Sequence, residues 1–464
     1  MSGHLFGRRA RYIAAAFFLI AVAIAFQIDV RLNPRPMGGA DEIAALAQRD
    51  DLNILFVLID TLRADRLSAY GYDRETSPNI DALADSGVRF AEQLSQSSWT
   101  KCSMASLWTG TYPQRTGVTR SPQAISEDAL MPAEILQEAG FRTFAIWRNG
   151  WIRPAFGFSQ GFEVYHSPRA TPIPGRVRRE RPSVSIVGTD QDTVFSAMEF
   201  LRSHTNDRWF LYLHLMDVHQ YVYDEESALF GTSYSDIYDN SIRWVDRVLA
   251  SLIGELDARG LREKTLIVLA ADHGEAFGEH GREGHARDVY GEVTTTPLIM
   301  SFPFRLDPEV VVQTPTANVD IWPTLLDMLG LPPLEDADGR SRMPAILAAA
   351  RGEPEPANDA IRFAHLDQAW SRTSNPERPM VSVSEGDYRL FRREGDQPAE
   401  LYDRSVDLRE QVDLATDRPE VVARMTELAE DYLAQPPADW AGGPDVEIDP
   451  AELEELRALG YQVE

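Results

Sequence analysis

The stretch that decides the fold is Asn53-Ile54-Leu55-Phe56-Val57-Leu58-Ile59-Asp60. A continuous apolar run that ends in a charged residue is typical of a strand buried on both faces. Similar runs occur at Phe141–Trp147, Trp209–Leu215 and Thr265–Ala271, and Pro297–Phe302 is a fifth candidate. Helical segments alternate with these strands, which predicts a mainly parallel sheet with helices on both of its faces.

Three helices are predicted between the strands. The first opens at Ser77-Pro78 and stops at Gly87, and the second covers Thr189–His204. The third, Tyr238–Arg259, places its apolar residues on one face. We therefore predict an α/β fold with a large, mainly parallel sheet flanked by helices.

The pattern changes after about residue 355. Short strand-like segments at 361–365, 388–392 and 401–403 precede predicted helices at 419–433 and 450–459. We expect a catalytic domain over residues 51–355 and a smaller C-terminal antiparallel α+β lobe over residues 356–464.

The N-terminal 30 residues predict export. Arg8, Arg9 and Arg11 precede an apolar run over Tyr12–Phe26, and Ala23-Ile24-Ala25 resembles a cleavage site. The run fits a signal peptide or an uncleaved membrane anchor, with a buried soluble helix as the third reading. Because the basic flank comes first, we expect the catalytic domain outside the cytoplasm, either membrane-anchored or secreted into the periplasm or medium. Residues 31–50 are predicted to be a linker.

The net charge of −27 makes nucleic acid an unlikely partner, and any anion site must be built from local charges. Cys102 is the single cysteine, which excludes a disulfide within the chain. The segment Arg169–Ser185 is basic and proline-rich. It is either a solvated insert or a loop that captures an acidic head group.

Polar side chains follow several predicted strands, at the edge of a parallel sheet where ligands bind. Asp60 follows the first strand, and Asp272-His273 follows the strand over residues 265–271. Two carboxylates and an imidazole on separate rigid elements are suitable ligands for a divalent metal ion. An Asp at a strand end is otherwise a common helix cap.

Several histidines lie near the same edge. His285 belongs to the glycine-rich loop over residues 272–285, which is either a binding loop or a surface loop. His214 falls inside the third strand and is interpreted as a packed core histidine. His219 lies beyond that strand and is the better functional candidate.

The segment Ser98–Gly110 predicts a helix that begins at Thr100 and stops at Gly110. Free N–H groups and the dipole at a helix start favour an incoming anion. Thr100 is therefore either an N-cap or a nucleophile directed at a sulfate or phosphate ester. Lys101 is either an exposed helix residue or a cation close to that ester.

These residues together resemble the sulfatase family, within the alkaline-phosphatase-like superfamily. The resemblance runs from about Asn53 to the C-terminus. It is carried by the segments at residues 53–63, 77–84, 109–113 and 272–275, and supported by 401–403 and 456–461.

The resemblance implies a nucleophile that also binds the metal. In sulfatases this is a cysteine in Cys-x-Pro-Ser-Arg or Cys-x-Ala-Ser-Arg, oxidised to formylglycine and placed ten residues before the glycine of a Thr-Gly pair. Counting back from Gly110 gives Thr100. Cys102 begins Cys-Ser-Met-Ala-Ser, in which Met104 stands at the arginine position, so formylglycine is not expected.

A second departure is Thr61, where many sulfatases carry another Asp. The remaining ligand set resembles the single-metal, threonine-nucleophile site of phosphoethanolamine and phosphoglycerol transferases. The resemblance implies one divalent ion (Ca, Mn, Zn or Mg), held by Asp60, Thr100, Asp272 and His273. It also assigns substrate-binding roles to the histidines at 219 and 285.

We therefore expect a metal-dependent hydrolase that cleaves sulfate or phosphate esters on a glycan or lipid head group. Thr100 would attack the ester, while Lys101, His219 and His285 stabilise its charge, and one histidine protonates the leaving alcohol. A threonyl ester must be attacked by water or another acceptor, which suits phosphate somewhat better than sulfate. Two alternatives remain: a phosphoethanolamine- or phosphoglycerol-type transferase acting on envelope lipid or glycan, and an inactive family member that binds a glycan.

Overall fold

The computed structural model describes residues 35–168, 188–357, 360–367, 379–393, 397–443, 445–448, 450 and 456. The chain divides into two compact units, Met1–Pro36 and Met37–Glu464, and the elements below belong to the second. The predicted signal or anchor (1–30), the basic segment Arg169–Ser185 and nearly all of the last predicted helix lie outside the described residues. Among the residues that are described, no helix is both long and apolar enough to cross a bilayer.

An eight-stranded sheet with the order β12-β2-β11-β7-β1-β6-β4-β5 forms the centre of the fold. Its strands are β1 (Asn53–Ile59), β2 (Val88–Phe90), β4 (Arg142–Ile146), β5 (Val164–His166), β6 (Trp209–Leu215), β7 (Thr265–Ala270), β11 (Leu298–Ser301) and β12 (Val310–Val312). The central strand β1 runs parallel to β6 and β7, whereas β11 is antiparallel to β7 and β2. The predicted α/β fold with a mainly parallel sheet is confirmed.

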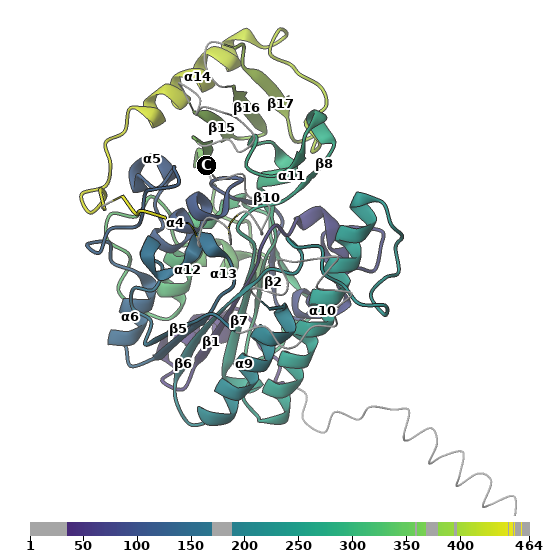
Figure 1. The fold of residues 1–464 in the computed structure, drawn as a ribbon, viewed down its shortest axis with the longest axis vertical. Coiled ribbons are helices and arrows are strands. Elements are labelled where there is room, and N and C mark those ends of the chain that lie inside the picture. The colour runs from purple at the N-terminus through teal and green to yellow at the C-terminus, as the bar shows by residue number, and fades with distance from the viewer. Residues whose placement is uncertain are drawn as a thin grey trace, which may run out of the picture. The chain divides into compact units, whose positions relative to one another are not determined.

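Helices cover both faces of this sheet (Figure 1). One face packs against α3 (Pro78–Ala84), α9 (Asp190–Ser203) and α10 (Tyr234–Ala258), and the other against α4 (Thr100–Thr109), α6 (Pro132–Glu138), α12 (Ile321–Met328) and α13 (Met343–Arg351). Along β1, Leu55 and Val57 pack on the face covered by α3, α9 and α10. Ile54 and Phe56 pack on the opposite face. Both faces of the strand are therefore buried, which explains its unbroken apolar sequence.

The start of α4 corrects the predicted capping role of Thr100. Trp99 occupies the N-cap position with extended backbone, and Thr100 is the first helical residue. Gly110 ends the helix in the left-handed region at φ 65°, as a C-terminal glycine commonly does. The Thr100 hydroxyl is thus not required as a helix cap.

The linker predicted over residues 31–50 is wrong for residues 40–48. These form α2 (Ala40–Ala44) and the 3-10 helix η1 (Ala45–Gln48), and both Ile43 and Leu46 are fully buried. The two side chains are three residues apart and share one helical face, a signal that the surrounding Pro and Gly residues obscured.

The C-terminal region forms an antiparallel sheet, which confirms the predicted α+β lobe. Its strands are β14 (Arg362–Leu366), β15 (Met380–Glu385), β16 (Tyr388–Arg392) and β17 (Glu400–Asp403), and α14 (Pro419–Leu433) packs on one face. Strand β15 was not predicted. The backbone N–H of His365 donates to the carbonyl of Gln96, which ties the lobe to the segment leading into α4.

Several short elements complete the described fold. They are β3 (Gln93–Leu94), β10 (Thr295–Thr296) and β13 (Thr316–Ala317) in a three-stranded sheet, the hairpin β8 (Ala276–Phe277) and β9 (Glu283–Gly284), and the helices α5 (Pro113–Thr116) and α11 (Gly291–Thr294).

Candidate active site

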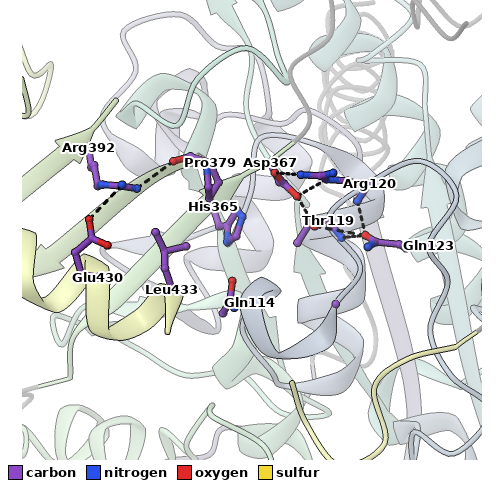
Figure 2. Close-up of a pocket in the computed structure, with 11 residues that line it drawn as sticks. Gln114, Thr119, Arg120, Gln123, His365, Asp367, Pro379, Arg392, Glu430 and Leu433 are labelled. Atoms are coloured by element: carbon purple, nitrogen blue, oxygen red, sulfur yellow. Dashed lines mark hydrogen bonds and ion pairs between the residues drawn. The ribbon is translucent and has the colours of Figure 1, made fainter. Parts of the chain in front are cut away.

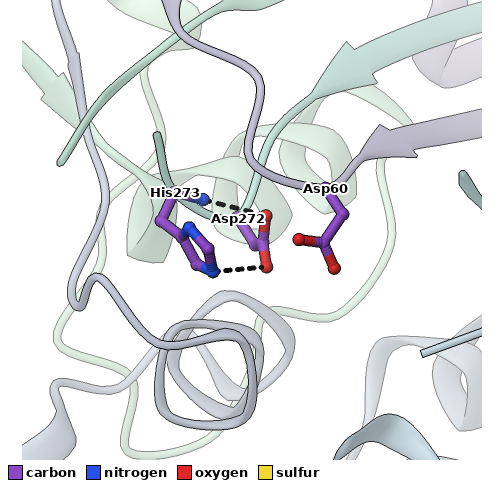
Figure 3. A group of neighbouring side chains, drawn as sticks. All are labelled: Asp60, Asp272 and His273. Atoms are coloured by element: carbon purple, nitrogen blue, oxygen red, sulfur yellow. Dashed lines mark hydrogen bonds and ion pairs between the residues drawn. The ribbon is translucent and has the colours of Figure 1, made fainter. Parts of the chain in front are cut away.

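Asp60, Asp272 and His273 meet beyond the carboxyl ends of β1 and β7 (Figure 3). One ligand-type atom from each residue lies within 4.8 Å of the other two, and all three side chains are buried. The adjacent, parallel placement of the two strands brings these residues together although more than 200 positions separate them. The predicted group of ligand residues therefore exists as a cluster.

The donor set fits a divalent cation. Asp60 Oδ1 and Asp272 Oδ2 are buried and have no hydrogen-bond partner among the described residues. Leaving two buried carboxylate oxygens without partners is costly unless a cation or a donor reaches them. His273 Nδ1 lies 2.9 Å from the carbonyl of Gly274, which leaves Nε2 as the ring nitrogen near Asp272 Oδ2, at 3.3 Å. Such a second contact orients a metal-binding imidazole.

The two carboxyl groups have opposite pKa shifts. Burial acts to raise the pKa of Asp60, but the nearby His219 and the hydrogen bond from His214 outweigh burial and hold that pKa well below its usual range. At Asp272, burial and then the charge of Asp60 raise the pKa. The cluster thus carries at least one buried negative charge.

His214 is buried, as predicted, but its contact with Asp60 was missed. Its Nε2 lies 2.9 Å from Asp60 Oδ2, and its Nδ1 lies 2.7 Å from the hydroxyl of Tyr212. Register explains the contact. His214 lies on β6 opposite Leu58 of the parallel strand β1, two residues before Asp60. The residue therefore orients the Asp60 carboxylate.

Thr100 lies beside the cluster. Its Oγ1 is 3.2 Å from His273 Nε2. The side-chain amide of Asn149 donates to Asp60 Oδ2 at 2.7 Å and to Thr100 Oγ1 at 3.3 Å. Sequence reasoning missed Asn149, and the available signal was its position just after the predicted strand over residues 141–147. The structure thus brings a hydroxyl, an amide and the acidic cluster together.

Both predicted histidines also lie here. The rings of His219 and His285 have centroids 4.9 Å apart, and His285 is 4.6 Å from the ring of His273. Burial lowers the pKa of His219 to about 4. Burial would lower the pKa of His285 as well, but the charge of Glu275, 3.2 Å from its Nδ1, raises it. The two imidazoles therefore have pKa values shifted in opposite directions.

Lys101 is not placed with these side chains. Within the described part of the chain, its ammonium donates to the carbonyls of Ser121 and Gln123, at 2.5 and 2.7 Å, and lies 4.0 Å from the ring centroid of Phe156. It is also fully buried, so the alternative of an exposed helix residue is wrong. A position one residue along a helix points about 100° away, which separates Lys101 from the Thr100 hydroxyl.

Cys102 is buried in the core packed under α4. Burial raises the pKa of its thiol to about 12. Two positions along a helix rotate a side chain by about 200°, so Thr100 and Cys102 point in nearly opposite directions.

A separate cavity of about 390 Å³ lies between the segment after α4 and the C-terminal sheet (Figure 2). Two ion pairs line it: Arg120 with Asp367 at 2.7 Å, and Arg392 with Glu430, within the C-terminal lobe, at 3.2 Å. Among its described lining residues, none is a predicted site residue.

Comparison with known proteins identifies relatives along most of the chain. A family model described as sulfatase matches residues 52–331, and one described as N-sulphoglucosamine sulphohydrolase, C-terminal, matches residues 278–435. An ulvan-active sulfatase from Formosa agariphila is 26% identical over 343 residues, 64% of this chain and 66% of that protein. An N-acetylgalactosamine-6-O-sulfatase from Bacteroides thetaiotaomicron is 24% identical over 477 residues, 82% of this chain and 92% of that protein.

Solved structures share the fold. Ps i-CgsB in complex with k-i-k-neocarrahexaose gives a TM-score of 0.68 at 18% identity, covering 88% of this chain and 97% of that one. The phosphonate monoester hydrolase of Agrobacterium radiobacter gives 0.65 at 20% identity, covering 83% and 96%. Because the sulfatase family model alone matches more than half of its length, this chain belongs to the sulfatase family.

Proposed function

We propose that this protein is a metal-dependent hydrolase of sulfate or phosphate esters that uses Thr100 as its nucleophile. The observation that carries the proposal is the position of Thr100 Oγ1, which lies 3.2 Å from His273 Nε2 and beside two buried carboxylates. The relatives include enzymes named as sulfatases and a phosphonate monoester hydrolase, which supports both kinds of ester.

The residues Asp60, Asp272 and His273, joined by Thr100, would hold one divalent ion, of the Ca, Mn, Zn or Mg type. Such an ion, when bound, lowers the pKa of a coordinated hydroxyl and polarises ester oxygens. Asn149 and His214 hold Asp60 in place through its Oδ2 and leave Oδ1 for the ion.

The protein's own groups perform the remaining steps. Thr100 Oγ releases its proton to solvent as it bonds to the sulfur or phosphorus, and the bond from that atom to the leaving oxygen breaks. Charge on the other ester oxygens is stabilised by the amide of Asn149, the ring of His219 and the backbone N–H groups in the first turn of α4. His285, whose pKa is raised, gives its proton to the leaving alcohol.

Water then attacks the sulfur or phosphorus of the threonyl ester, the bond from that atom to Thr100 Oγ breaks, and sulfate or phosphate leaves. One water proton restores the Thr100 hydroxyl and the other returns to His285. An aldehyde-derived nucleophile can expel sulfate by breakdown of its hemiacetal, and threonine has no such route. This chemistry supports phosphate esters alongside sulfate esters. Relatives named for ulvan and N-acetylgalactosamine sulfate support an anionic ester on a glycan as the substrate class.

A panel of aryl sulfate, phosphate monoester and phosphodiester substrates tests the proposal, with each metal ion in turn. We expect Thr100→Ala to lower kcat by about 10³-fold or more on the preferred ester, as for other nucleophile deletions. Cys102→Ala, two residues along the same helix, is the matched control and should retain activity. Full activity in Thr100→Ala, or its loss in a folded Cys102→Ala protein, would overturn the assignment.

A further inference from the structure

A buried ionic cluster lies next to the site, formed by Arg148, Asp190 and Asp217. Arg148 Nη1 lies 2.5 Å from Asp190 Oδ1 and 2.7 Å from Asp217 Oδ1, and all three side chains are 0% exposed. The residues follow β4, begin α9 and follow β6, respectively. The cluster therefore joins three elements at the edge of the sheet where the site lies.

The two carboxylates also bind backbone amides of each other's segments. Asp190 accepts from the N–H groups of Met216 and Asp217, at 2.7 and 2.8 Å. Asp217 accepts from the N–H of Asp190 at 3.0 Å and from the indole of Trp244 at 2.8 Å. Charge-assisted hydrogen bonds of this kind impose geometry as well as attraction. The segment after β6 is consequently fixed to the start of α9.

The cluster contacts the segments that carry two residues of the site, Asn149 and His219. Arg148 directly precedes Asn149, the donor to Asp60 and Thr100. On the other side, Arg148 contacts Asp217 and also donates to Gln220 Oε1 at 2.8 Å, so one guanidinium holds residues on both sides of His219. A guanidinium presents its donors in a rigid planar fork of fixed geometry, whereas a lysine ammonium is a compact point charge on a flexible stem.

Burial and the charge of Asp217 raise the pKa of Asp190 to about 7, so the cluster is costly to bury and stability alone does not account for it. Replacing a buried ion cluster with apolar or neutral side chains of similar size is often neutral or stabilising, because burial removes hydration from every charge. We infer that Arg148, Asp190 and Asp217 form a positioning cluster that fixes His219 and Asn149 relative to each other. The inference rests on the proposed function for the chemical roles of those two residues.

The deciding comparison is between Arg148→Met and a charge-free triple variant, Arg148→Met/Asp190→Asn/Asp217→Asn. The single variant leaves two buried carboxylates without their cation and should lower Tm strongly. In the triple variant we expect Tm to return close to that of the wild type, while kcat stays about 10²-fold lower with KM within about threefold, as for misplaced catalytic groups. Recovery of kcat together with Tm would show a merely structural role and overturn the inference.

Two further measurements keep the test decisive. Arg148→Lys retains the charge and loses the fork, so we expect a folded protein whose His219 imidazole NMR signals, assigned with His219→Gln, move away from the wild-type position. Unchanged signals in that variant would overturn the inference even if the triple variant does not fold. This readout needs no turnover, so a wild-type protein without ester hydrolysis would defeat the proposed function and leave the positioning test intact.

Arg262→Met is the matched control for loss of a buried arginine. Arg262 donates to the carbonyls of Thr265 and Phe302 at the opposite end of β7. We expect Arg262→Met to lower Tm and to leave kcat and the His219 NMR signals unchanged.

Discussion

Asp60 and Asp272 each combine one carboxylate oxygen that is held by hydrogen bonds with one that is not. Each keeps one buried carboxylate oxygen without a hydrogen-bond partner among the described residues. The other oxygen of each is held: Asp60 Oδ2 by Asn149 and His214, and Asp272 Oδ1 by the N–H groups of Thr61 and His273. The hydrogen bonds to Asp60 Oδ2 and Asp272 Oδ1 therefore fix the directions in which Asp60 Oδ1 and Asp272 Oδ2 point.

Asp272→Asn tests this arrangement. The Asn oxygen can still accept from the two backbone N–H groups, while the repulsion from Asp60 disappears. We expect the metal-free variant to melt no lower than the metal-free wild type. Divalent metal at about 100 times its Kd should stabilise the wild type by about 2.7 kcal/mol and the variant hardly at all.

Thermal melts with chelator and with each metal provide the measurement, and Asp246→Asn controls for loss of a buried carboxyl elsewhere. Equal metal stabilisation of wild type and Asp272→Asn would contradict the ligand assignment.

At this scale the sequence predicted Asp60, Asp272 and His273 as neighbours because they follow strands at one sheet edge, and the resemblance to the sulfatase family added Thr100 to them. It could not predict the contact of His214 with Asp60, which depends on the register between β1 and β6. Nor could it show that the Lys101 ammonium would find two carbonyls after α4, because that contact depends on tertiary packing.

Among the elements, the β8–β9 hairpin loop shows how the lobes are joined. His280 Nδ1 lies 2.9 Å from Glu292 Oε1 and its Nε2 lies 2.7 Å from the carbonyl of Glu410, while its ring stacks on Tyr290 at 3.9 Å. Because both ring nitrogens face acceptors, the imidazolium is favoured. Burial acts to lower the pKa of His280, but Glu292 and the Glu410 carbonyl raise it to about 9.

This shift predicts a pH-dependent stability. A raised folded-state pKa gives stabilisation that is complete below the unfolded value of about 6.5 and is lost as pH rises through about 9. Between pH 6 and 9.5 we expect the free energy of unfolding of the wild type to fall by on the order of 1 to 3 kcal/mol through this group. The His280→Gln variant should lack this fall.

Urea unfolding at several pH values measures this difference, and His204→Gln controls for removal of an imidazole. Parallel pH profiles for wild type and His280→Gln would show that the contact contributes nothing in this window.

Elements with strong periodicity or long apolar runs were predictable, and those with weaker signals were not. Strands β1, β6 and β7 and helix α10 follow directly from their patterns. Strand β15 escaped because its burial depends on α14 and its neighbouring strands. The antiparallel direction of β11 likewise follows from chain connections that an apolar run does not encode.

Across the whole molecule, residues Met37–Glu464 form one compact unit that includes the C-terminal sheet. Arg362 pairs with Glu92, and the Arg389 guanidinium donates to Thr294 Oγ1 at 2.7 Å. We therefore expect the two lobes to unfold together, in a single calorimetric transition. Two resolved transitions would show that the two lobes are independent folding units.

The central claim is that Thr100 forms the covalent intermediate of a sulfatase-family reaction. Rapid acid quench of the metal-loaded enzyme with its preferred ester, followed by site-resolved mass spectrometry, tests it most directly. We predict one added sulfuryl or phosphoryl group on Thr100 and an unmodified thiol at Cys102. A group on any other residue, or formylglycine at position 102, would contradict the account.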